Sequence, residues 1–415
     1  MTMQKLFILF LFALLVSCKQ TPQITEWRGT NRTGVFEANN LLKSWPQEGP
    51  SMLWEVETLG NGYSSPIVTD EHIYISGEVD SIGYLFKLDQ SGNEIWRSAY
   101  GKEWTTNFPG PRGTPTLAGN HIYLCSGMGD VFCKDASTGE TVWQKSMPNE
   151  LQGVSPRFGY SQALVVHDDF VYCQPGGTEN NLVALNRHSG ELIWAAKGMG
   201  ERPAYNSPCL FKWGNKKILA AFSAYHLLGF DAQTGQLLWT HEQTNTRPED
   251  RQPGQGDTHG NTILFDNGFI YYAAADGNGG IKLALNKTGD AITEIWTTPK
   301  LDNFMGGFVK LHNTLYTGSH RKQQLVAIDS NTSTKTDSLK LGRGITIAAD
   351  SMLYFYSNNG TISLIDPSSS QLTSKGKFRL KKGTKEHYAH PAIHNGKLYL
   401  RHGNYLGVYD IQAKS

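Results

Sequence analysis

The chain has 415 residues, which is long enough for two or three ordinary domains or for one large repeat domain. It carries 38 Lys and Arg against 37 Asp and Glu, and this balance argues against nucleic acid or a polybasic membrane contact, which require a strong basic excess. Charged residues make up only 18% of the chain, whereas it contains 44 glycines and 11% aromatic residues, a composition typical of a turn-rich all-β protein.

The first residues have the pattern of a targeting signal. Lys5 precedes the apolar run 6–16, which is too short to span a bilayer. The following Leu-Val-Ser-Cys stretch, ending at Cys18, resembles a bacterial lipobox, which implies cleavage before Cys18 and acylation of its thiol. An ordinary signal peptide with a chance cysteine is the alternative. Because Lys19 rather than Asp follows the cysteine, we expect a lipoprotein of the outer membrane that faces the periplasm.

Residues 51–56, "SMLWEV", look like the end of a repeat that lacks a beginning. The next segment supplies a whole unit, with short β-rich runs at 66–69, 73–76, 84–88 and 94–96 separated by turn residues. We therefore expect each unit to be a four-stranded antiparallel sheet.

An Asp or Asn followed by Gly opens a phrase that ends on Trp in five units, at Trp96, Trp143, Trp194, Trp239 and Trp296. The opening residue recurs about every 46 residues, which is a period typical of a β-propeller. The eight opening positions predict eight blades: Asp89, Asp135, Asn186, Asp231, Asn286, Asp329, Asp366 and Asp410.

The last blade lacks a fourth strand, because only five residues follow Asp410. We expect the N-terminal strand 51–56 to complete it and to close the ring, since an open seam would expose unpaired backbone groups. Trp54 would then pack between the last and first blades. In the sixth and seventh units, Leu339 and Phe378 are the expected substitutes for the missing Trp.

Four cysteines remain beyond Cys18, namely Cys125, Cys133, Cys173 and Cys209. They allow three pairings, among which the sequence does not choose. Cys125 and Cys133 flank a turn and are expected on neighbouring strands. Buried free thiols are the commoner outcome for cysteines at strand positions.

The phrase Asp-x-x-[Ser/Thr]-Gly-x-x-x-Trp at this period resembles the pyrroloquinoline-quinone-like propeller family, from Trp54 to Asp410. The resemblance implies an all-β, eight-bladed propeller, and the family includes quinoprotein alcohol dehydrogenases and a lipoprotein of the outer-membrane β-barrel assembly machinery. The lead-in stretches 27–35 ("WRGTNRTGV") and 44–55 resemble a bacterial subgroup without an assigned function. The expected organisation is a signal peptide (1–17), a lipidated tether and lead-in (18–50, with a polar tether over 19–26) and the propeller (51–415).

One rim should carry the tight turns and the other the long loops 97–113, 147–160 and 241–260, and long loops on a rigid scaffold favour recognition. Arg and Tyr at the channel mouth suit a polar or anionic ligand or a partner loop, with a merely solvated mouth as the alternative. The residues expected to ring the mouth are Tyr63, Arg112, Arg157, Tyr160, Tyr205, Asn206, His259, Asn261, Asn303, Arg343, Tyr388 and His390.

No catalytic or metal-binding motif stands out. His387 and His390 would point to opposite faces of a strand, and residues 276–280 are more simply a hairpin turn than a calcium loop. We expect no cofactor, neither pyrroloquinoline quinone nor calcium, because the adjacent cysteines and the Cys-x-x-Cys-His haem site often found in the quinone enzymes are absent from the sequence.

The expected function is that of a non-catalytic periplasmic lipoprotein propeller at the outer membrane. It would act as a scaffold for a periplasmic or outer-membrane protein, or for a polar or anionic ligand. A quinone-dependent dehydrogenase-like enzyme is one alternative. A glycan-binding or glycan-processing propeller is another, suggested by rim aromatics at Trp104, Phe108, Tyr160 and Tyr205.

Overall fold

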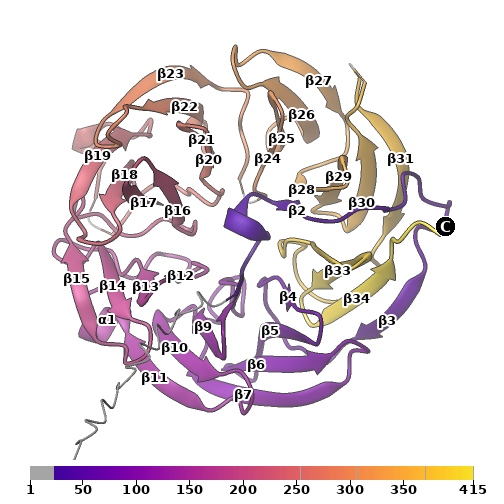
Figure 1. Cartoon of the computed structure of the whole chain (residues 1–415), viewed down its shortest axis with the longest axis horizontal. Coiled ribbons are helices and arrows are strands. Elements are labelled where there is room, and N and C mark those ends of the chain that lie inside the picture. Colours follow the sequence, from indigo (N-terminus) through magenta and orange to yellow (C-terminus); the bar gives the residue numbers. More distant parts are fainter. Residues whose placement is uncertain (1–22, 253, 305, 370, 415) are drawn as a thin grey trace, which may run out of the picture.

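A computed structural model describes residues 23–252, 254–304, 306–369 and 371–414. Eight antiparallel sheets surround a central axis (Figure 1), and this confirms the predicted all-β, eight-bladed propeller. The expected signal peptide and Cys18 lie outside the described residues. No helix in the described ranges is long and apolar enough to cross a membrane.

The blades are numbered in chain order. Blade 1 contains β4 (Ile67–Val68), β5 (His72–Val79), β6 (Ile82–Asp89) and β7 (Glu94–Lys102). Blade 2 contains β8 (Thr116–Ala118), β9 (His121–Cys125), β10 (Asp130–Asp135) and β11 (Thr141–Ser146). Blade 3 contains β12 (Val165–His167), β13 (Phe170–Cys173), β14 (Leu182–Asn186) and β15 (Leu192–Ala196). Blade 4 contains β16 (Cys209–Trp213), β17 (Lys216–Phe222), β18 (His226–Asp231) and β19 (Leu237–Glu242).

Blade 5 contains β20 (Leu264–Asp266), β21 (Phe269–Ala274), β22 (Gly279–Leu285) and β23 (Ile292–Thr298). Blade 6 contains β24 (Val309–Leu311), β25 (Thr314–Ser319), β26 (Gln324–Asp329) and β27 (Lys335–Leu339). Blade 7 contains β28 (Gly344–Ala349), β29 (Met352–Ser357), β30 (Thr361–Asp366) and β31 (Thr373–Arg379). Blade 8 contains β32 (Ala392–His394), β33 (Lys397–His402), β34 (Tyr405–Asp410) and the N-terminal β3 (Met52–Val56). Loops hold α1 (Met147–Glu150) and η2 (Pro248–Asp250).

The repeat phrase builds the contact between neighbouring blades. Asp89 accepts the backbone N–H groups of Ser91 and Asn93 and so fixes the turn before the fourth strand. Gly92 has a φ of 87°, and a Cβ there would lie 2.6 Å from the indole of Trp54. The glycine of one blade is therefore needed both for the turn and for the tryptophan of the preceding blade.

The predicted ring closure is confirmed. β3 pairs with β34, with Trp54 opposite Val408 and Val56 opposite Leu406. The indole N–H of Trp54 donates to the carbonyl of Gln90 in blade 1 at 2.9 Å. Trp96 and Trp143 make the same contact with the turns of blades 2 and 3.

Trp296 of blade 5 keeps this contact by donating to the carbonyl of Ser330, but other later blade contacts depart from the repeat. Between blades 4 and 5, Trp213 rather than Trp239 donates to the next turn, at the carbonyl of Asn286. Leu339 packs against the apolar cluster between blades 6 and 7. Phe378 contacts Tyr409 in blade 8 and Trp45 of the lead-in, with ring centroids 4.8 and 5.4 Å apart.

All four described cysteines are buried free thiols. Cys125 and Cys133 lie on the paired strands β9 and β10, as expected from the turn between them.

The lead-in enters the central channel and leaves it again. β1 (Ile24–Thr25) adds to the inner edge of blade 2, antiparallel to β8. η1 (Thr30–Arg32) lies at the centre of the ring (Figure 1), and β2 (Val35–Phe36) then adds to blade 7, parallel to β28. We call residues 24–36 the channel plug. The chain then crosses outward to β3, so residues 23–50 are packed into the propeller rather than preceding it.

The two faces of the ring differ as the strand order requires. The turns between first and second and between third and fourth strands form one face, which we call the short-turn face. The loops 103–115, 147–163 and 243–262 lie on the other, the long-loop face. Because β1 runs opposite to β8 and β2 runs along β28, the plug enters from the short-turn face and returns to it.

Candidate functional site

Arg32 ties the plug to blades 3 and 4. Its guanidinium donates to the backbone carbonyls of Ala163 at 2.8 Å, Leu164 at 2.7 Å and Pro208 at 3.3 Å. Its Nε also donates to the carboxylate of Glu26 at 2.7 Å, within the plug itself. A rigid planar guanidinium can donate to several acceptors at once, so this one buried side chain joins the plug to the channel wall at blades 3 and 4.

Arg28 ties the plug to the opposite wall. Its guanidinium donates to the carbonyls of Phe308 at 2.8 Å and Thr346 at 3.3 Å, which belong to blades 6 and 7. A third contact joins it to Nδ1 of His390 at 2.9 Å. Complete burial lowers the pKa of Arg28 to about 9, which leaves it charged at neutral pH. The two arginines thus span the channel and make it blind.

A pocket of about 240 Å³ opens on the long-loop face above the plug. Trp27 of the plug lines it, so the pocket ends on the plug and does not continue as a channel. The other lining residues come from the connections that enter the inner strands: Tyr63, Phe108, Arg112, Thr114, Phe158, Ser161, Ala163, Tyr205, Ser207, Thr258, Gly260, Phe304, Tyr388 and His390.

Aromatic rings form a belt around this pocket. Tyr63 lies 5.8 Å from Tyr388, and Tyr388 lies 6.1 Å from Phe108, between ring centroids. Phe108 lies 6.0 Å from Phe158, which lies 5.6 Å from Tyr205. These separations are those of interacting aromatic pairs, so the rings support one another around the cavity that they line.

Phe108 is held in an unusual conformation at this belt. Its φ is 47°, a region that L-residues rarely occupy, and its side chain is 36% exposed. Backbone strain of this kind costs about 1–3 kcal/mol and concentrates at functional sites. The exposed ring of Phe108 is therefore the position in the belt most suggestive of ligand contact.

Arg112 supplies the positive charge that lines the pocket. It donates to the carbonyls of Asn107 and Phe108 at 2.8 and 2.9 Å, which orders the loop that carries Phe108. The carboxyl of Glu103 is nearby and is buried, and burial raises its pKa to about 6. The Tyr63 hydroxyl donates to the carboxylate of Glu386 at 2.5 Å. Burial, and after it this hydrogen bond, raises the pKa of the Tyr63 phenol above its ordinary value.

The structure divides the residues expected at the mouth into a set on the long-loop face and a set buried in the channel wall. Five of them line the pocket: Tyr63, Arg112, Tyr205, Tyr388 and His390. Arg157 lies on the rim, exposed, with its guanidinium 5.3 Å from the ring centroid of Phe158. Arg343 lines a separate cavity of about 60 Å³ with His320 and His387, and it donates to the carbonyl of His320.

The second set is buried in the channel wall rather than placed at the mouth. Tyr160 donates to the carbonyl of Pro175, and Asn261 donates to those of Ala273 and Asn303. Asn206 is also buried, at 2% exposure. Tyr160 and Asn261 thus bind backbone carbonyls of the wall, which is a role that sequence position did not distinguish from lining the mouth.

His259 is likewise part of the wall and carries no charge at neutral pH. It is fully buried, with its ring 4.3 Å from that of Phe222 and 5.8 Å from that of Tyr272. Burial lowers the pKa of His259 to about 3, with a further contribution from Arg202. His259 therefore adds no cation for an anionic ligand and lies in the wall, whereas it was expected among the residues that ring the mouth.

Sequence reasoning did not place Trp27, Phe158 or Phe304 at the pocket. Phe158 follows the expected Arg157 in a long loop, so an aromatic next to a rim arginine is a usable signal. Trp27 belongs to a lead-in without a repeat and could not be located from periodicity.

The pocket is poorly suited to a redox quinone. Such a cofactor needs a cation at its carbonyls and a carboxylate as base. Among the described residues, no Asp or Glu lines the pocket, and no group of three or more His, Cys, Asp or Glu could hold a metal ion. The side chains offer apolar contact and one guanidinium instead.

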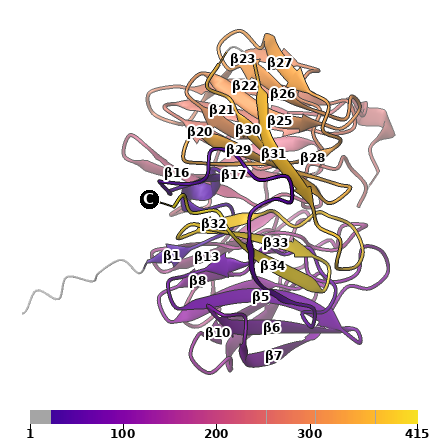
Figure 2. The same ribbon diagram turned by 90° about the vertical axis from the view of Figure 1, so that its right-hand side faces the viewer.

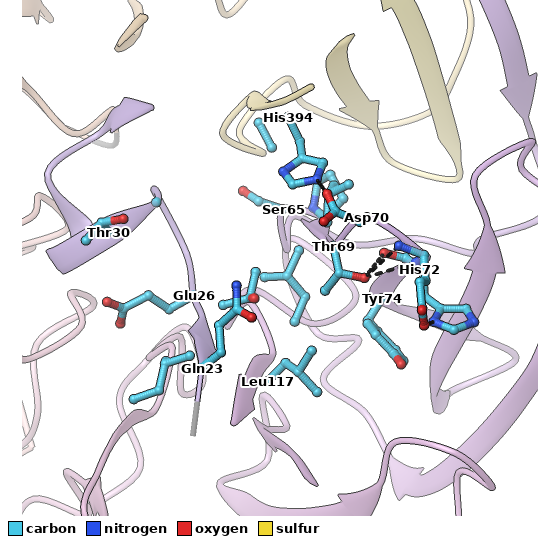
Figure 3. Close-up of a pocket in the computed structure, with 18 of the residues that line it drawn as sticks. Gln23, Glu26, Thr30, Ser65, Thr69, Asp70, His72, Tyr74, Leu117 and His394 are labelled. Carbon is cyan, nitrogen blue, oxygen red and sulfur yellow. Dashed lines mark hydrogen bonds and ion pairs between the residues drawn. The ribbon is translucent and has the colours of Figure 1, made fainter. Parts of the chain in front are cut away.

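A larger cavity of about 720 Å³ lies on the short-turn face, between the lead-in and blades 8, 1 and 2 (Figure 3). Gln23, Glu26 and Thr30 line it on the lead-in side. On the blade side, His394 contacts Asp70 at 2.9 Å, and this contact together with Asn395 lowers the pKa of Asp70. The lead-in therefore lies between two cavities of different character.

Comparisons with known proteins agree with this architecture. A protein-family model described as outer membrane protein assembly factor BamB matches residues 81–336, which is more than half of the chain. The chain is 30% identical over 172 residues to the outer membrane protein assembly factor BamB of Moranella endobia, covering 39% of this chain and 41% of that protein. It is 24% identical over 153 residues to the quinoprotein alcohol dehydrogenase PedH of Pseudomonas putida, covering 35% of this chain and 24% of that protein. The chain thus spans less than half the length of these relatives.

Solved structures share the fold at low identity. BamB from Moraxella catarrhalis superposes with a TM-score of 0.63 and 12% identity, covering 87% of this chain and 99% of that one. The quinohemoprotein alcohol dehydrogenase from Comamonas testosteroni gives a TM-score of 0.65 and 13% identity, covering 93% of this chain and 80% of that one. With the family match, the repeat phrase and the eight closed blades in agreement, this chain belongs to the BamB-like family of pyrroloquinoline-quinone-like β-propellers.

Proposed function

We propose that this chain is a non-catalytic scaffold lipoprotein of the outer membrane, facing the periplasm and anchored through Cys18. It takes an apolar or aromatic group of a periplasmic or outer-membrane protein into the pocket on its long-loop face. The similarity to BamB supports a location in the cell envelope and an outer-membrane partner. The lipobox pattern supports the anchor.

The observation that carries the proposal is the blind aromatic pocket. Its volume of about 240 Å³ is below the range usual for small-molecule and cofactor sites and suits a single inserted side chain. Burying an aromatic side chain removes 150–250 Å² from water, which contributes roughly 4–6 kcal/mol before the costs of association. One aromatic side chain of a partner, buried in this pocket, could therefore anchor an interface.

The pocket can be tested directly with an environment-sensitive dye. Anilinonaphthalene sulfonate can insert one aromatic ring into the pocket and place its sulfonate near Arg112. We expect the double substitution Phe108→Ala with Phe158→Ala to abolish its fluorescence enhancement. The matched control is Ile95→Ala with Ile295→Ala, which removes two side chains that are 49% and 47% exposed on outer strands. Equal dye binding by both variants would contradict the assignment of the pocket.

The partner can be tested in cells. A photo-crosslinking amino acid at Phe108 should give one discrete adduct with an envelope protein, and the same residue at Ile295 should not. Phe158→Ala should weaken the adduct, because it removes the neighbouring ring of the belt. The absence of an adduct at Phe108, or an identical set at both positions, would overturn the scaffold proposal.

A glycan is the second candidate ligand, because aromatic side chains line the open mouth of the pocket. Binding of an oligosaccharide on a glycan array that is lost in the Phe108 and Phe158 double variant would move this candidate to first place.

We also propose that the protein binds neither pyrroloquinoline quinone nor calcium, because the pocket lacks the carboxylate that quinone chemistry requires. Purified protein mixed with both should show no stoichiometric quinone absorbance and no dye-linked alcohol oxidation. Quinone binding with turnover would favour the dehydrogenase alternative.

A further inference from the structure

The start of the described chain is fixed to the short-turn face. The carbonyl of Gln23 accepts the backbone N–H of Gly119, in the turn between β8 and β9. Gln23 also lines the cavity on this face, beside Leu117 (Figure 3). The next two residues form β1, which lies at one face of the ring in the edge-on view (Figure 2).

The plug prevents this attachment point from moving. Ile24 and Thr25 are paired with Ala118 and Leu117, and Arg28 and Arg32 hold the following turn to opposite walls of the channel. A chain that enters the propeller here therefore has a root near the axis of the ring, not at its edge.

The distance from the expected lipid anchor to this root is short. Four residues lie between Cys18 and Gln23, and the five Cα-to-Cα steps of a fully extended chain span at most about 18 Å. A compact chain of this size has a radius of gyration of roughly 22 Å. The tether is therefore too short to pass from the axis around the edge of the ring to the other face.

On the basis of the proposed acylation of Cys18, we infer that the short-turn face is the surface that meets the membrane, and that the aromatic pocket opens away from it. The plug then has two roles, because it ends the pocket and fixes the orientation of the whole ring. A partner that inserts a side chain into the pocket must approach from the periplasmic side.

On the proposed acylation, the acyl chains rather than surface charge hold the short-turn face at the membrane. Turn hydrogen bonds lower the pKa of the repeat carboxylates, such as Asp89 and Asp135, and keep them ionised. Lys217 on this face is paired with Asp168 at 2.5 Å. Such a surface is not polybasic, so electrostatic attraction to anionic lipid should contribute little.

Fluorescent labels on the two faces test the orientation. Gln233→Cys places a thiol in an exposed short turn of blade 4, and Thr106→Cys places one in an exposed long loop. The native thiols do not interfere, because all four in the described ranges are buried. The two faces are separated by the length of the strands, which have 6 residues in β10 and 9 residues in β7. At about 3.3 Å per residue, this is about 20–30 Å.

The lipidated full-length protein is reconstituted into vesicles of phosphatidylethanolamine and phosphatidylglycerol with a headgroup-linked quencher. We expect the label at position 233 to lose most of its fluorescence and the label at position 106 to keep it, at low and at high salt. A flexible Gly-Ser insertion of 20 residues after Lys19 is the matched control. Its root-mean-square span of roughly 25 Å should make the two labels alike.

The outcomes separate the orientation from the anchor. Equal or reversed quenching in membrane-bound protein would overturn the orientation, and so would an unchanged pattern after the insertion, because the short tether would then not be its cause. A full-length protein that carries no acyl group and does not bind the vesicles would instead overturn the proposed anchor.

Discussion

Replacing Arg32 by methionine keeps most of the side-chain volume of this residue and removes every hydrogen bond through which it ties the plug to the channel wall. The carbonyls of Ala163 and Pro208 lose their side-chain donor, that of Leu164 keeps only the Thr116 hydroxyl, and Glu26 loses its ion pair. The change should therefore release the plug.

The magnitude follows from the contacts. A buried acceptor left without a donor costs about 1–3 kcal/mol. If the Ala163 and Pro208 carbonyls both stayed dry, the loss would be about 2–6 kcal/mol. Detachment of the plug lets water reach these carbonyls, which limits the penalty to the free energy that docks the plug. We expect a loss of about 3–4 kcal/mol in that docking free energy, which corresponds to about two to three orders of magnitude in the opening equilibrium.

Hydrogen exchange measures this opening locally. In the wild type, the Gly34 N–H donates to the Arg28 carbonyl and the Ala348 N–H donates to the Gly34 carbonyl, at 2.9 and 2.8 Å. Peptides covering 24–36 should lose protection in Arg32→Met, whereas those of β33 and β34 should keep it, because blade 8 is closed separately by β3. The matched control is Arg247→Met, at an arginine whose side chain is 69% exposed.

Unchanged protection of residues 24–36 in Arg32→Met would refute the assignment of this side chain as the main tie of the plug. Loss of protection throughout the blades would show that the plug is needed for the ring itself and does not dock as a separate unit.

Three further predictions concern the ring, the anchor and the pH dependence of stability. Trp54→Ala should lower the free energy of unfolding by about 2–4 kcal/mol, measured by urea unfolding, and should promote oligomers through a loosened blade 8, measured by light scattering. A truncated chain starting at residue 61 that melts like the mature protein would contradict ring closure. Cys18→Ala should move the protein from the membrane fraction to the soluble periplasm, and unchanged fractionation would point to a protein partner as the anchor. Because the folded pKa of His259 is about 3, below its ordinary 6.5, the unfolded chain takes up the proton and stability falls as the pH drops below 6.5, by about 2 kcal/mol at pH 5. His259→Phe should remove this part of the acid sensitivity, whereas His312→Phe, at an exposed histidine, should not. Equal dependence of the unfolding free energy on pH in the two variants would show that His259 is not the titrating group.

The repeat was readable because it is local. Asp89, Gly92 and the tryptophan of a neighbouring blade act within one turn and one blade contact, so the same residue types recur at each contact of this kind. Contacts that depart from the phrase were less predictable. Trp213 makes the hydrogen bond expected from the motif tryptophan, because the inner strand of blade 4 brings a second indole to the same turn.

The candidate site was predicted only in part. The positions at which loops join the inner strands placed Tyr63, Arg112 and Tyr205 at the mouth, since strand order decides which loops reach the long-loop face. Whether a side chain there points into the channel or into the wall depends on the neighbouring blades. His259 illustrates this, because Phe222 and Tyr272 enclose its ring.

The amino-acid sequence by itself determined the number of blades, the strand that closes the ring and the division into a face of short turns and a face of long loops, because each follows from a period and from chain order. Only the tertiary structure decided that the lead-in occupies the channel. Arg28 and Arg32 bind backbone carbonyls of Phe308, Leu164 and their neighbours, and a carbonyl has no sequence signature. The blind aromatic pocket and the direction in which it faces follow from those contacts, which form between residues more than 100 positions apart.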